Sequence, residues 1–330
     1  MICNLCRLDP RLGLRRKAFG VVDILKHEPL VLRREAFFNG YFMTMKIIHS
    51  INDMQVFSES LRSKGHKIAF VPTMGYFHEG HLSLMKEGRR RGDCLIISIY
   101  VNPAQFGPGE DLQSYPRDFD RDRRLAENVG VDVIFYPDDA EMYPLHYQTY
   151  VSVERVTLNL CGMSRPGHFR GVTTVCLKLF NIVRPHATIF GRKDFQQLVA
   201  IQRMVRDLNM DLEVVGMPIV RENDGLAMSS RNVYLKEGER DSALSLSGSL
   251  KLAKELYDGG ERSASIILDS VKKYIERYPY ARIDYAKICD TATLEDVEQL
   301  AGEAVLALAV KVSSTRLIDN YVFEDKLNKY

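Results

Sequence analysis

Short apolar runs alternate with amphipathic segments along most of the chain. Five runs are apolar almost throughout, as is typical of strands that are buried on both faces of a sheet. They occupy residues 67–72, 94–101, 131–137, 187–190 and 212–216. Amphipathic segments at helical spacing predict helices at residues 80–92, 118–130, 171–183 and 194–208. This alternation predicts an α/β fold with a doubly wound, Rossmann-like parallel sheet that helices cover on both faces.

The alternation begins at Met45. The stretch MKIIHSINDMQVFSESLRSKG (45–65) predicts a short strand and then a helix, with Ser50 or Asn52 as the N-cap and Gly65 as the C-cap. We therefore expect the Rossmann-like, ligand-binding domain to cover residues 45–221.

A different pattern follows residue 222. Two helices and then two or three strands predict a smaller α+β C-terminal domain at 222–330, which we expect to close over the site. The helices are expected at 238–258 and 263–278, and the strands at 281–290, 304–312 and 316–323. The stretch RENDGLAMSSRN (221–232) is the expected connector.

The first 44 residues lack this organisation. They carry eight Lys and Arg against four acids and contain no apolar segment of secretory length, so a signal peptide is not predicted. Serine is nearly absent, which disfavours a transit peptide. We interpret residues 1–44 as a basic N-terminal extension that is disordered or is a non-native start, with Met45 as the start of the functional chain.

Composition narrows the class of protein. The 330 residues are 45% hydrophobic and carry a formal charge of +2, so no basic field indicates nucleic acid. The longest apolar runs are too short to span a bilayer. Six cysteines are scattered without a disulfide pattern, and Cys3-x-x-Cys6 has no second ligand pair for zinc, so we interpret that pair as incidental. These features predict a cytoplasmic location.

Chemistry is expected where strands end, because a doubly wound sheet binds its ligand at the carboxyl ends of its strands. The first such loop, in FVPTMGYFHEGHLSLM (70–85), holds His78, Gly80 and His81 at a strand-to-helix turn. A surface loop with solvated histidines is the simplest alternative. A zinc protease is disfavoured because its two histidines lie four residues apart on a helix, whereas these lie three apart. A helix N-terminus with free N–H groups and two histidines suits the phosphates of ATP.

Three more stretches follow predicted strands or join the domains. VNPAQF (101–106) offers Asn102 and Gln105, FGRKDFQQ (190–197) offers Lys193 and Gln197, and GLAMSSRN (225–232) offers hydroxyls and Arg231. Lysine and arginine are the cations that a triphosphate needs. Together these stretches predict a nucleotide site with an amide-lined substrate pocket.

Five stretches, in this order, resemble the pantothenate synthetase (pantoate–β-alanine ligase) family of the nucleotidyltransferase superfamily. They are PTMGYFHEGH, VNPAQFGPGEDLQSYPRD, SRPGHFRGV, FGRKDFQQL and DGLAMSSRN. The resemblance covers residues 45 to 323 and implies a homodimeric ligase that uses ATP and Mg²⁺. It implies that the pantoate carboxylate attacks the α-phosphorus, giving pantoyl adenylate and pyrophosphate. The amine of β-alanine then displaces AMP, giving pantothenate for coenzyme A synthesis.

The resemblance also implies roles for individual residues. Catalysis falls to His78, His81, Lys193 and Arg231, with His81 as the proton donor, and no metal ligand is assigned. Gln105 and Gln197 hold pantoate, Gln105 also faces β-alanine, and Asn102, Arg165 and His168 are neighbours. The implied ATP contacts are Met74, Gly75, Tyr76, Phe77, His78, Glu79, Gly80, His81, Gly191, Arg192, Lys193, Asp194, Val220, Met228, Ser229, Ser230 and Arg231.

This chain departs from the family pattern in two places. Arg192 stands where the family commonly has Glu or Gln, and its side chain would add positive charge if it faced the phosphates. Tyr76-Phe77 is bulkier than the usual pair, which would change the entrance to the site.

Other functions remain open from the residues alone. The chain could be a nucleotidyltransferase that stops after nucleotidyl transfer, since VSSTRLID (312–319) resembles a Ser-Ser-Thr signature of such enzymes. We interpret that stretch as structural, because it lies among the predicted strands of the small domain. A short class I aminoacyl-tRNA synthetase is disfavoured, because no anticodon-binding region is visible. A catalytically inactive nucleotide-binding or scaffolding protein is the alternative of a different class.

Overall fold

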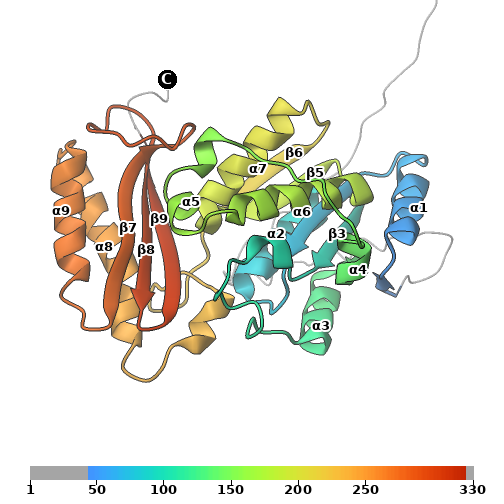
Figure 1. Cartoon of the computed structure of the whole chain (residues 1–330), viewed down its shortest axis with the longest axis horizontal. Coiled ribbons are helices and arrows are strands. Elements are labelled where there is room, and N and C mark those ends of the chain that lie inside the picture. Colours follow the sequence, from blue (N-terminus) through green and yellow to red (C-terminus); the bar gives the residue numbers. More distant parts are fainter. Residues whose placement is uncertain (1–43, 325–330) are drawn as a thin grey trace, which may run out of the picture. The chain divides into compact units, whose positions relative to one another are not determined.

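A computed structural model of the chain describes residues 44–324. These residues belong to one compact unit (Figure 1). The interpretations of residues 1–44 and of the Cys3–Cys6 pair fall outside the described part, except for the last residue of that extension. Within the described range, no helix is both long enough and apolar enough to cross a membrane.

A six-stranded parallel sheet forms the first half of this unit, as the apolar runs predict. Its strands are β1 (Lys46–Ile48), β2 (Ile68–Thr73), β3 (Cys94–Ile99), β4 (Val133–Phe135), β5 (Ala187–Gly191) and β6 (Glu213–Met217). Their order is β1-β4-β3-β2-β5-β6. After β2 the chain moves outward through β3 and β4, and it later moves to the other side through β5 and β6. The direction reverses beside β2 and β5, which is where an open α/β sheet binds its ligand.

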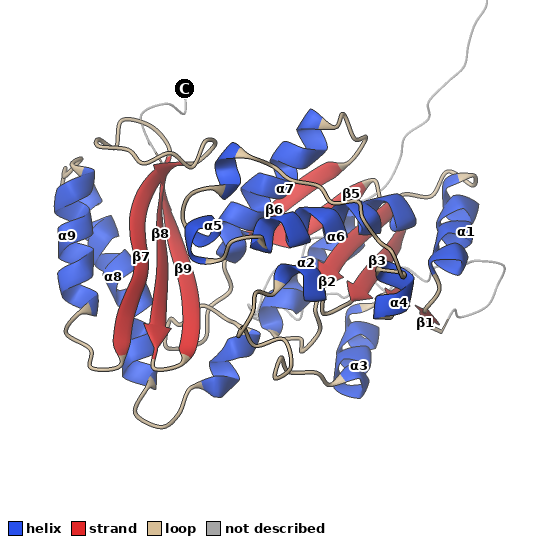
Figure 2. Ribbon diagram, viewed as in Figure 1, coloured by secondary structure: helices blue, strands red, loops and turns tan. Residues whose placement is uncertain are grey.

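Helices cover both faces of this sheet (Figure 2). They are α1 (Ile51–Arg62), α2 (Glu79–Arg91), α3 (Phe119–Val129), α4 (Asp139–Met142), α5 (Cys161–Ser164), α6 (His168–Val183) and α7 (Phe195–Asp207). Short 3₁₀ turns also follow strands and loops: η1 (Pro103–Gln105), η2 (Arg155–Thr157), η3 (Arg192–Asp194) and η4 (Ser230–Tyr234). Helix α2 packs against α3, whereas α6 packs against α1 and α7. The two directions of strand progression place these two groups on opposite faces when crossovers are right-handed.

The predicted start of α1 is confirmed, whereas its C-cap is Ser63, two residues before the predicted Gly65. The Ser50 side chain accepts a hydrogen bond from the Asp53 N–H at 3.1 Å and caps the helix. The helix ends at Arg62 with Ser63 as its C-cap, and Gly65 closes the turn that follows: its N–H donates to the Arg62 carbonyl at 2.9 Å, and the His66 N–H donates to the Leu61 carbonyl at 3.1 Å. Gly65 has φ +77° and lies in the turn that follows.

The second half contains an antiparallel sheet and two helices. The strands β7 (Ala281–Asp290), β8 (Ala304–Val312) and β9 (Thr315–Phe323) pair in that order. Helices α8 (Arg240–Asp258) and α9 (Ala264–Ile275) lie on one face of this sheet (Figure 1). Leu306, Leu308 and Val310 of β8 are fully buried in the core they share with these helices. The Ser-Ser-Thr stretch lies in the β8–β9 turn and the start of β9, as expected of a structural segment.

Candidate active site

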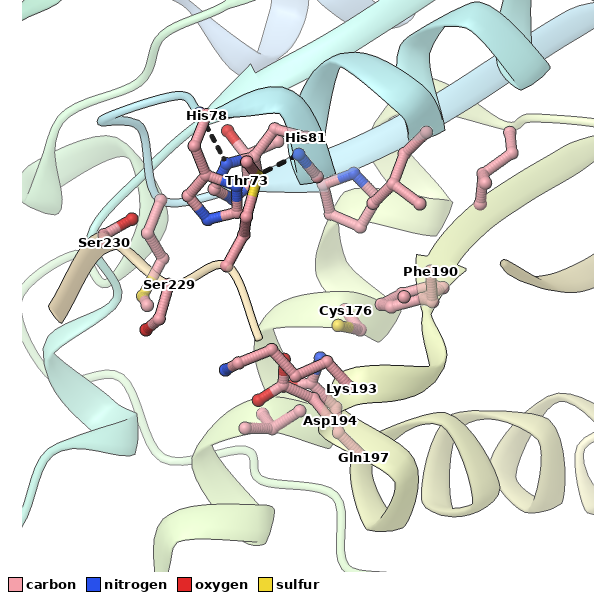
Figure 3. A pocket seen from close by; sticks show the side chains of 18 of the residues that line it. Thr73, His78, His81, Cys176, Phe190, Lys193, Asp194, Gln197, Ser229 and Ser230 are labelled. Carbon is pink, nitrogen blue, oxygen red and sulfur yellow. Dashed lines mark hydrogen bonds between the residues drawn. The ribbon is translucent and has the colours of Figure 1, made fainter. Parts of the chain in front are cut away.

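A cavity of about 220 Å³ lies where the parallel sheet reverses direction. It is bordered by the loops after β2, β3 and β5 and by the connector that follows β6. The sequence-predicted residues that line it are Met74, His78, Gly80, His81, Asn102, Gln105, Gly191, Lys193, Asp194, Gln197, Val220, Met228, Ser229, Ser230 and Arg231. Segments far apart in the chain therefore meet at the carboxyl ends of the strands, as the Rossmann-like pattern predicts (Figure 3).

Five predicted ATP contacts do not line this cavity. They are Gly75, Tyr76, Phe77, Glu79 and Arg192. Phe77 is fully buried in the hydrophobic core between α2 and the parallel sheet, and Glu79 is exposed. Neither Tyr76 nor Phe77 lines the cavity.

A buried carboxylate holds the loop after β2 in place. Gly75 and Tyr76 have φ values of +82° and +53°, so the chain turns through the left-handed region twice in succession. Asp122 of α3 accepts hydrogen bonds from the N–H groups of Tyr76 at 2.5 Å and Phe77 at 2.7 Å. Its side chain is 1% exposed. These two bonds fix the direction in which the chain enters α2.

Two imidazoles cap the start of α2. The Gly80 N–H donates to His78 Nδ1 at 3.2 Å, and the His78 N–H donates to His81 Nδ1 at 3.3 Å. A ring nitrogen that accepts carries no proton, so a neutral ring must carry its proton on Nε2. Both histidines therefore offer an Nε2–H donor, and their rings lie 4.1 Å apart.

Both histidines are held neutral. Burial, reinforced by the ammonium of Lys193, lowers the pKa of His78 to about 4. Burial, with His78 and Lys193 nearby, lowers the pKa of His81 well below its ordinary value. At neutral pH the pair consists of hydrogen-bond donors without net charge, whose orientation the backbone fixes.

The expectation of free N–H groups at this helix start is wrong for Gly80. Its N–H is already bonded to the His78 ring, because that ring folds back over it. A Cβ at Gly80 would lie 2.8 Å from His78 Cε1, so a glycine is needed for this close approach. The Gly80 N–H is thus replaced as a donor by the imidazole N–H groups.

The loop after β3 presents one oriented amide. Asn102 Oδ1 accepts from the Ala104 N–H, and its Nδ2 donates to the Gly171 carbonyl at 3.1 Å, which fixes its own amide. The same Nδ2 donates to Gln105 Oε1 at 3.2 Å. Gln105 Oε1 must therefore face Asn102, and its Nε2 donates one hydrogen to Met74 Sδ at 3.2 Å, which leaves the other as a donor. Asn102 is 1% exposed and orients the Gln105 amide through this hydrogen bond.

Arg165 and His168 hold the main chain of Gln105 rather than line the cavity. His168 Nδ1 donates to the Gln105 carbonyl at 2.8 Å, and Arg165 Nη2 donates to the same oxygen at 3.2 Å. Arg165 also forms a two-pronged ion pair with Glu110. Burial, with Arg165 adjacent, lowers the pKa of His168 to about 4. The two neighbours thus stabilise the loop that carries the amide.

The loop after β5 divides its residues between cavity and scaffold. Lys193, Asp194 and Gln197 line the cavity, across from His78 in Figure 3. Gln196 instead donates to two carbonyls of the 156–159 segment and accepts from the Cys161 N–H. The exposed Arg192 side chain lies beside Gly216 of β6: a Cβ added to Gly216 would be 3.5 Å from the Cγ and Nε atoms of Arg192. Its charge is therefore not part of the cavity lining.

The connector supplies the last side of the cavity. Met228 N–H donates to the Val220 carbonyl at 3.0 Å, which closes the loop between them. Arg231 makes a fork-like ion pair with Asp111, with both N···O distances 2.8 Å. Burial opposes ionisation of Asp111, but its hydrogen bonds to Arg231 outweigh burial and lower its pKa. An anion that bound Arg231 would therefore share it with Asp111.

Sequence reasoning missed the apolar side of the cavity. Val172, Val175, Cys176 and Leu179 of α6 line it, as do Pro218 and Ile219. Their three- and four-residue spacing was a signal of a helix face, but such spacing does not separate a cavity wall from a core. Asp122 was missed because nothing in its charged surroundings marks it as buried.

A second cavity is larger, about 490 Å³, but has different chemistry. It is lined by residues 151–156, by Arg203, Met204, Asp207 and Leu208 at and just beyond the end of α7, and by the loop residues Thr293 and Glu295. Its charged side chains are of both signs and several are exposed. Among residues 44–324, no group of three or more His, Cys, Asp or Glu side chains could hold a metal ion. The first cavity is the candidate active site because oriented donors and a cation converge on it.

Comparison with known proteins matches this arrangement to one family. The family model described as pantoate-beta-alanine ligase matches residues 46–322. A pantothenate synthetase of Syntrophus aciditrophicus is 70% identical over 284 residues, 86% of this chain and 99% of that protein. That of Geobacter sulfurreducens is 59% identical over 282 residues, 86% of this chain and all of the relative.

Solved structures agree. A pantothenate synthetase from Thermus thermophilus superposes with a TM-score of 0.79 at 42% identity, over 84% of this chain and 99% of that one. A pantoate-beta-alanine ligase from Francisella tularensis, complexed with beta-gamma ATP and beta-alanine, has a TM-score of 0.70 at 30% identity over 84% and 98%. The chain belongs to the pantoate–β-alanine ligase family.

Proposed function

We propose that the cavity carries out both steps of an ATP-dependent condensation of pantoate with β-alanine. The observation that supports this most is the meeting of two neutral Nε2–H donors, one lysine and a fixed amide in a single cavity. In the first step the pantoate carboxylate oxygen bonds to the α-phosphorus of ATP and the bond to pyrophosphate breaks. In the second, the β-alanine amine bonds to the acyl carbon, loses a proton, and AMP leaves.

The roles of the residues follow from their chemistry. His81 and His78 donate hydrogen bonds to α-phosphate oxygens as negative charge builds up there. They act as hydrogen-bond donors rather than as acids, because their lowered pKa values make the imidazolium form scarce at neutral pH. Lys193 supplies the positive charge for the phosphates, and Arg231 adds to it while paired with Asp111.

Pantoate is held by amides. The Nε2–H group of Gln105 faces the cavity, and Gln197 lies on the first turn of α7, so each offers an uncharged donor to pantoate. An arginine would stabilise the carboxylate and reduce its nucleophilicity, whereas amides orient it at lower cost. The apolar wall from α6 suits the hydrocarbon part of pantoate.

Mg²⁺ fits the oxygen donors of this cavity. Protein sites bind it through one or two carboxylates together with substrate phosphates, and Asp194 is an exposed carboxylate beside Lys193. When bound, Mg²⁺ would neutralise charge on the triphosphate and on departing pyrophosphate. A homodimer in the cytoplasm completes the proposal, supported by the family resemblance for the dimer and by the cysteine pattern for the location.

The amide assignment can be tested on Gln197. Gln197→Ala leaves a pantoate oxygen poorly paired, at about 1–3 kcal/mol, or roughly 5- to 150-fold in kcat/KM for pantoate. ATP affinity, measured by calorimetry without pantoate, should stay close to that of the parent. The exposed Gln202 of the same helix gives a matched control, and Gln202→Ala should change neither quantity. Loss of ATP affinity in Gln197→Ala would show that this amide belongs to the nucleotide.

A further inference from the structure

The C-terminal strand β9 reaches the loops that form the ATP side of the cavity. It is an edge strand of the antiparallel sheet, paired on one side with β8. Its contacts include the turns η3 and η4, which carry Lys193 and Arg231. Two adjacent residues of β9 are buried beside these loops: Asn320, 6% exposed, bonds to η3, and Asp319, 2% exposed, bonds to Arg221 of the connector. Neither lines the cavity.

Asn320 binds the main chain on which Lys193 stands. Its Nδ2 donates to the carbonyls of Arg192 and Lys193, each at 2.9 Å. One amide group thus holds two consecutive peptide units of η3. This contact joins residues 127 positions apart in the sequence. Because a lysine side chain is long and flexible, the direction of its ammonium depends on how firmly its main chain is held.

Asp319 holds the second loop from the same strand. It forms a fork-like ion pair with Arg221, with N···O distances of 2.6 and 2.9 Å. Arg221 also donates to the Gly225 carbonyl and lies next to Val220, which lines the cavity. The Asp319 carboxylate further accepts from the Asn320 N–H at 2.8 Å, so the two residues support each other.

We propose that Asn320, supported by Asp319, is a positioning residue of the ATP site that fixes the main chain of the Lys193 turn. The inference rests on the proposed role of Lys193 in binding phosphate. It assigns to strand β9 of the small domain a supporting part in forming the nucleotide site, through the main chain of η3. A residue that only stabilised the fold would affect ATP binding equally whether or not Lys193 were present.

A double-mutant cycle separates these roles. The four proteins are the parent, Asn320→Ala, Lys193→Met and the double variant, and calorimetric titration with Mg-ATP in the absence of pantoate gives each affinity. Asn320→Ala should weaken ATP binding about tenfold when Lys193 is present, within the range expected for unpaired carbonyls. In the Lys193→Met background the same change should alter the affinity by less than about twofold, because the group it positions is gone. Asn320→Leu, of similar size, replaces the alanine variant if that protein does not fold.

Asn159 provides the matched control. Its Nδ2 donates to the Leu294 carbonyl at 2.9 Å and to Asp296 at 2.8 Å, so it is another amide that links distant segments, but it does not line the cavity. Asn159→Ala should lower the Tm and leave ATP affinity unchanged. Equal losses from Asn320→Ala in both backgrounds, or no loss in either, would overturn the proposal. A parent that binds ATP but makes no pantothenate would refute the proposed function alone, since the cycle measures only ATP binding.

Discussion

His81 has two separable roles, capping α2 and donating a hydrogen bond to the substrate, and two substitutions distinguish them. Its Nδ1 accepts the His78 N–H at 3.3 Å, which helps to cap α2, while its Nε2–H is the donor we assign to the α-phosphate. In His81→Asn, the side-chain oxygen can take the place of Nδ1, but no group reaches as far as Nε2. In His81→Gln, the longer amide can place its N–H near the Nε2 position, but the cap is lost.

The expected losses in kcat and in the free energy of unfolding can be estimated for each role. Losing one donor to a transition-state oxygen costs about 10²- to 10³-fold in kcat. Losing a cap costs about 0.5–2 kcal/mol, and the lower end is appropriate because 3.3 Å is a long hydrogen bond. His81→Asn should therefore keep most of the free energy of unfolding but lose about 10²-fold or more in kcat. His81→Gln should be the less stable and the more active of the two.

Single-turnover formation of pantoyl adenylate gives the rate, and urea denaturation gives the free energy of unfolding. ATP affinity should fall less than kcat in both variants, because the interaction is strongest in the transition state. A His81→Asn enzyme that turns over at nearly the parent rate would remove the Nε2–H donor from the mechanism. Equal activity of the two variants would show that capping, rather than donation, is what His81 contributes.

Three further outcomes are expected. Gly80→Ala should change the free energy of unfolding little, since alanine favours the helix by up to about 1 kcal/mol while the lost His78 cap costs about 0.5–2 kcal/mol. It should lose roughly tenfold or more in kcat, because the new Cβ displaces the His78 ring, and an active Gly80→Ala enzyme would contradict the predicted collision. Gly302→Ala, where a Cβ meets nothing within 4 Å, is the control. The free energy of unfolding should fall as the pH drops from about 6.5 to 4, by at most about 3 kcal/mol per histidine, because the unfolded chain binds protons at His78 and His168 that the folded chain does not. The slope of this free energy against pH, measured by urea denaturation, should be shallower in His78→Asn, and an unchanged slope would contradict the lowered pKa of His78. A chain that begins at Met45 should fold and keep its activity, as measured by circular dichroism and pantothenate formation, and an insoluble product would show that residues 1–44 belong to the folded enzyme.

The sequence predicted the sheet well because its strands are buried on both faces. Runs such as 94–101 become β3, and its six residues Cys94–Ile99 are all buried, so hydrophobicity alone marks them. Element ends were less predictable, because they depend on local capping. Gly65 closes the turn after α1, as a glycine at a helix end is suited to do, but the C-cap itself is Ser63.

The site was predictable as a set of loops but not as a set of contacts. Strand ends identified the segments that meet at the cavity. Which groups face it depends on hydrogen bonds between distant residues, such as Asp122 with Tyr76 or Asn320 with Lys193, and these leave no periodic pattern in the sequence. Of two adjacent glutamines on α7, only Gln197 lines the cavity, because Gln196 turns toward the 156–161 segment.

The order of the two chemical steps is the central claim, and isotope exchange tests it most directly. The purified protein is incubated with ATP, Mg²⁺ and labelled pyrophosphate, and label in ATP is measured with and without each other substrate. If pantoate is adenylated first, exchange requires pantoate and proceeds without β-alanine. Exchange that appears only after β-alanine is added would contradict the pantoyl-adenylate intermediate.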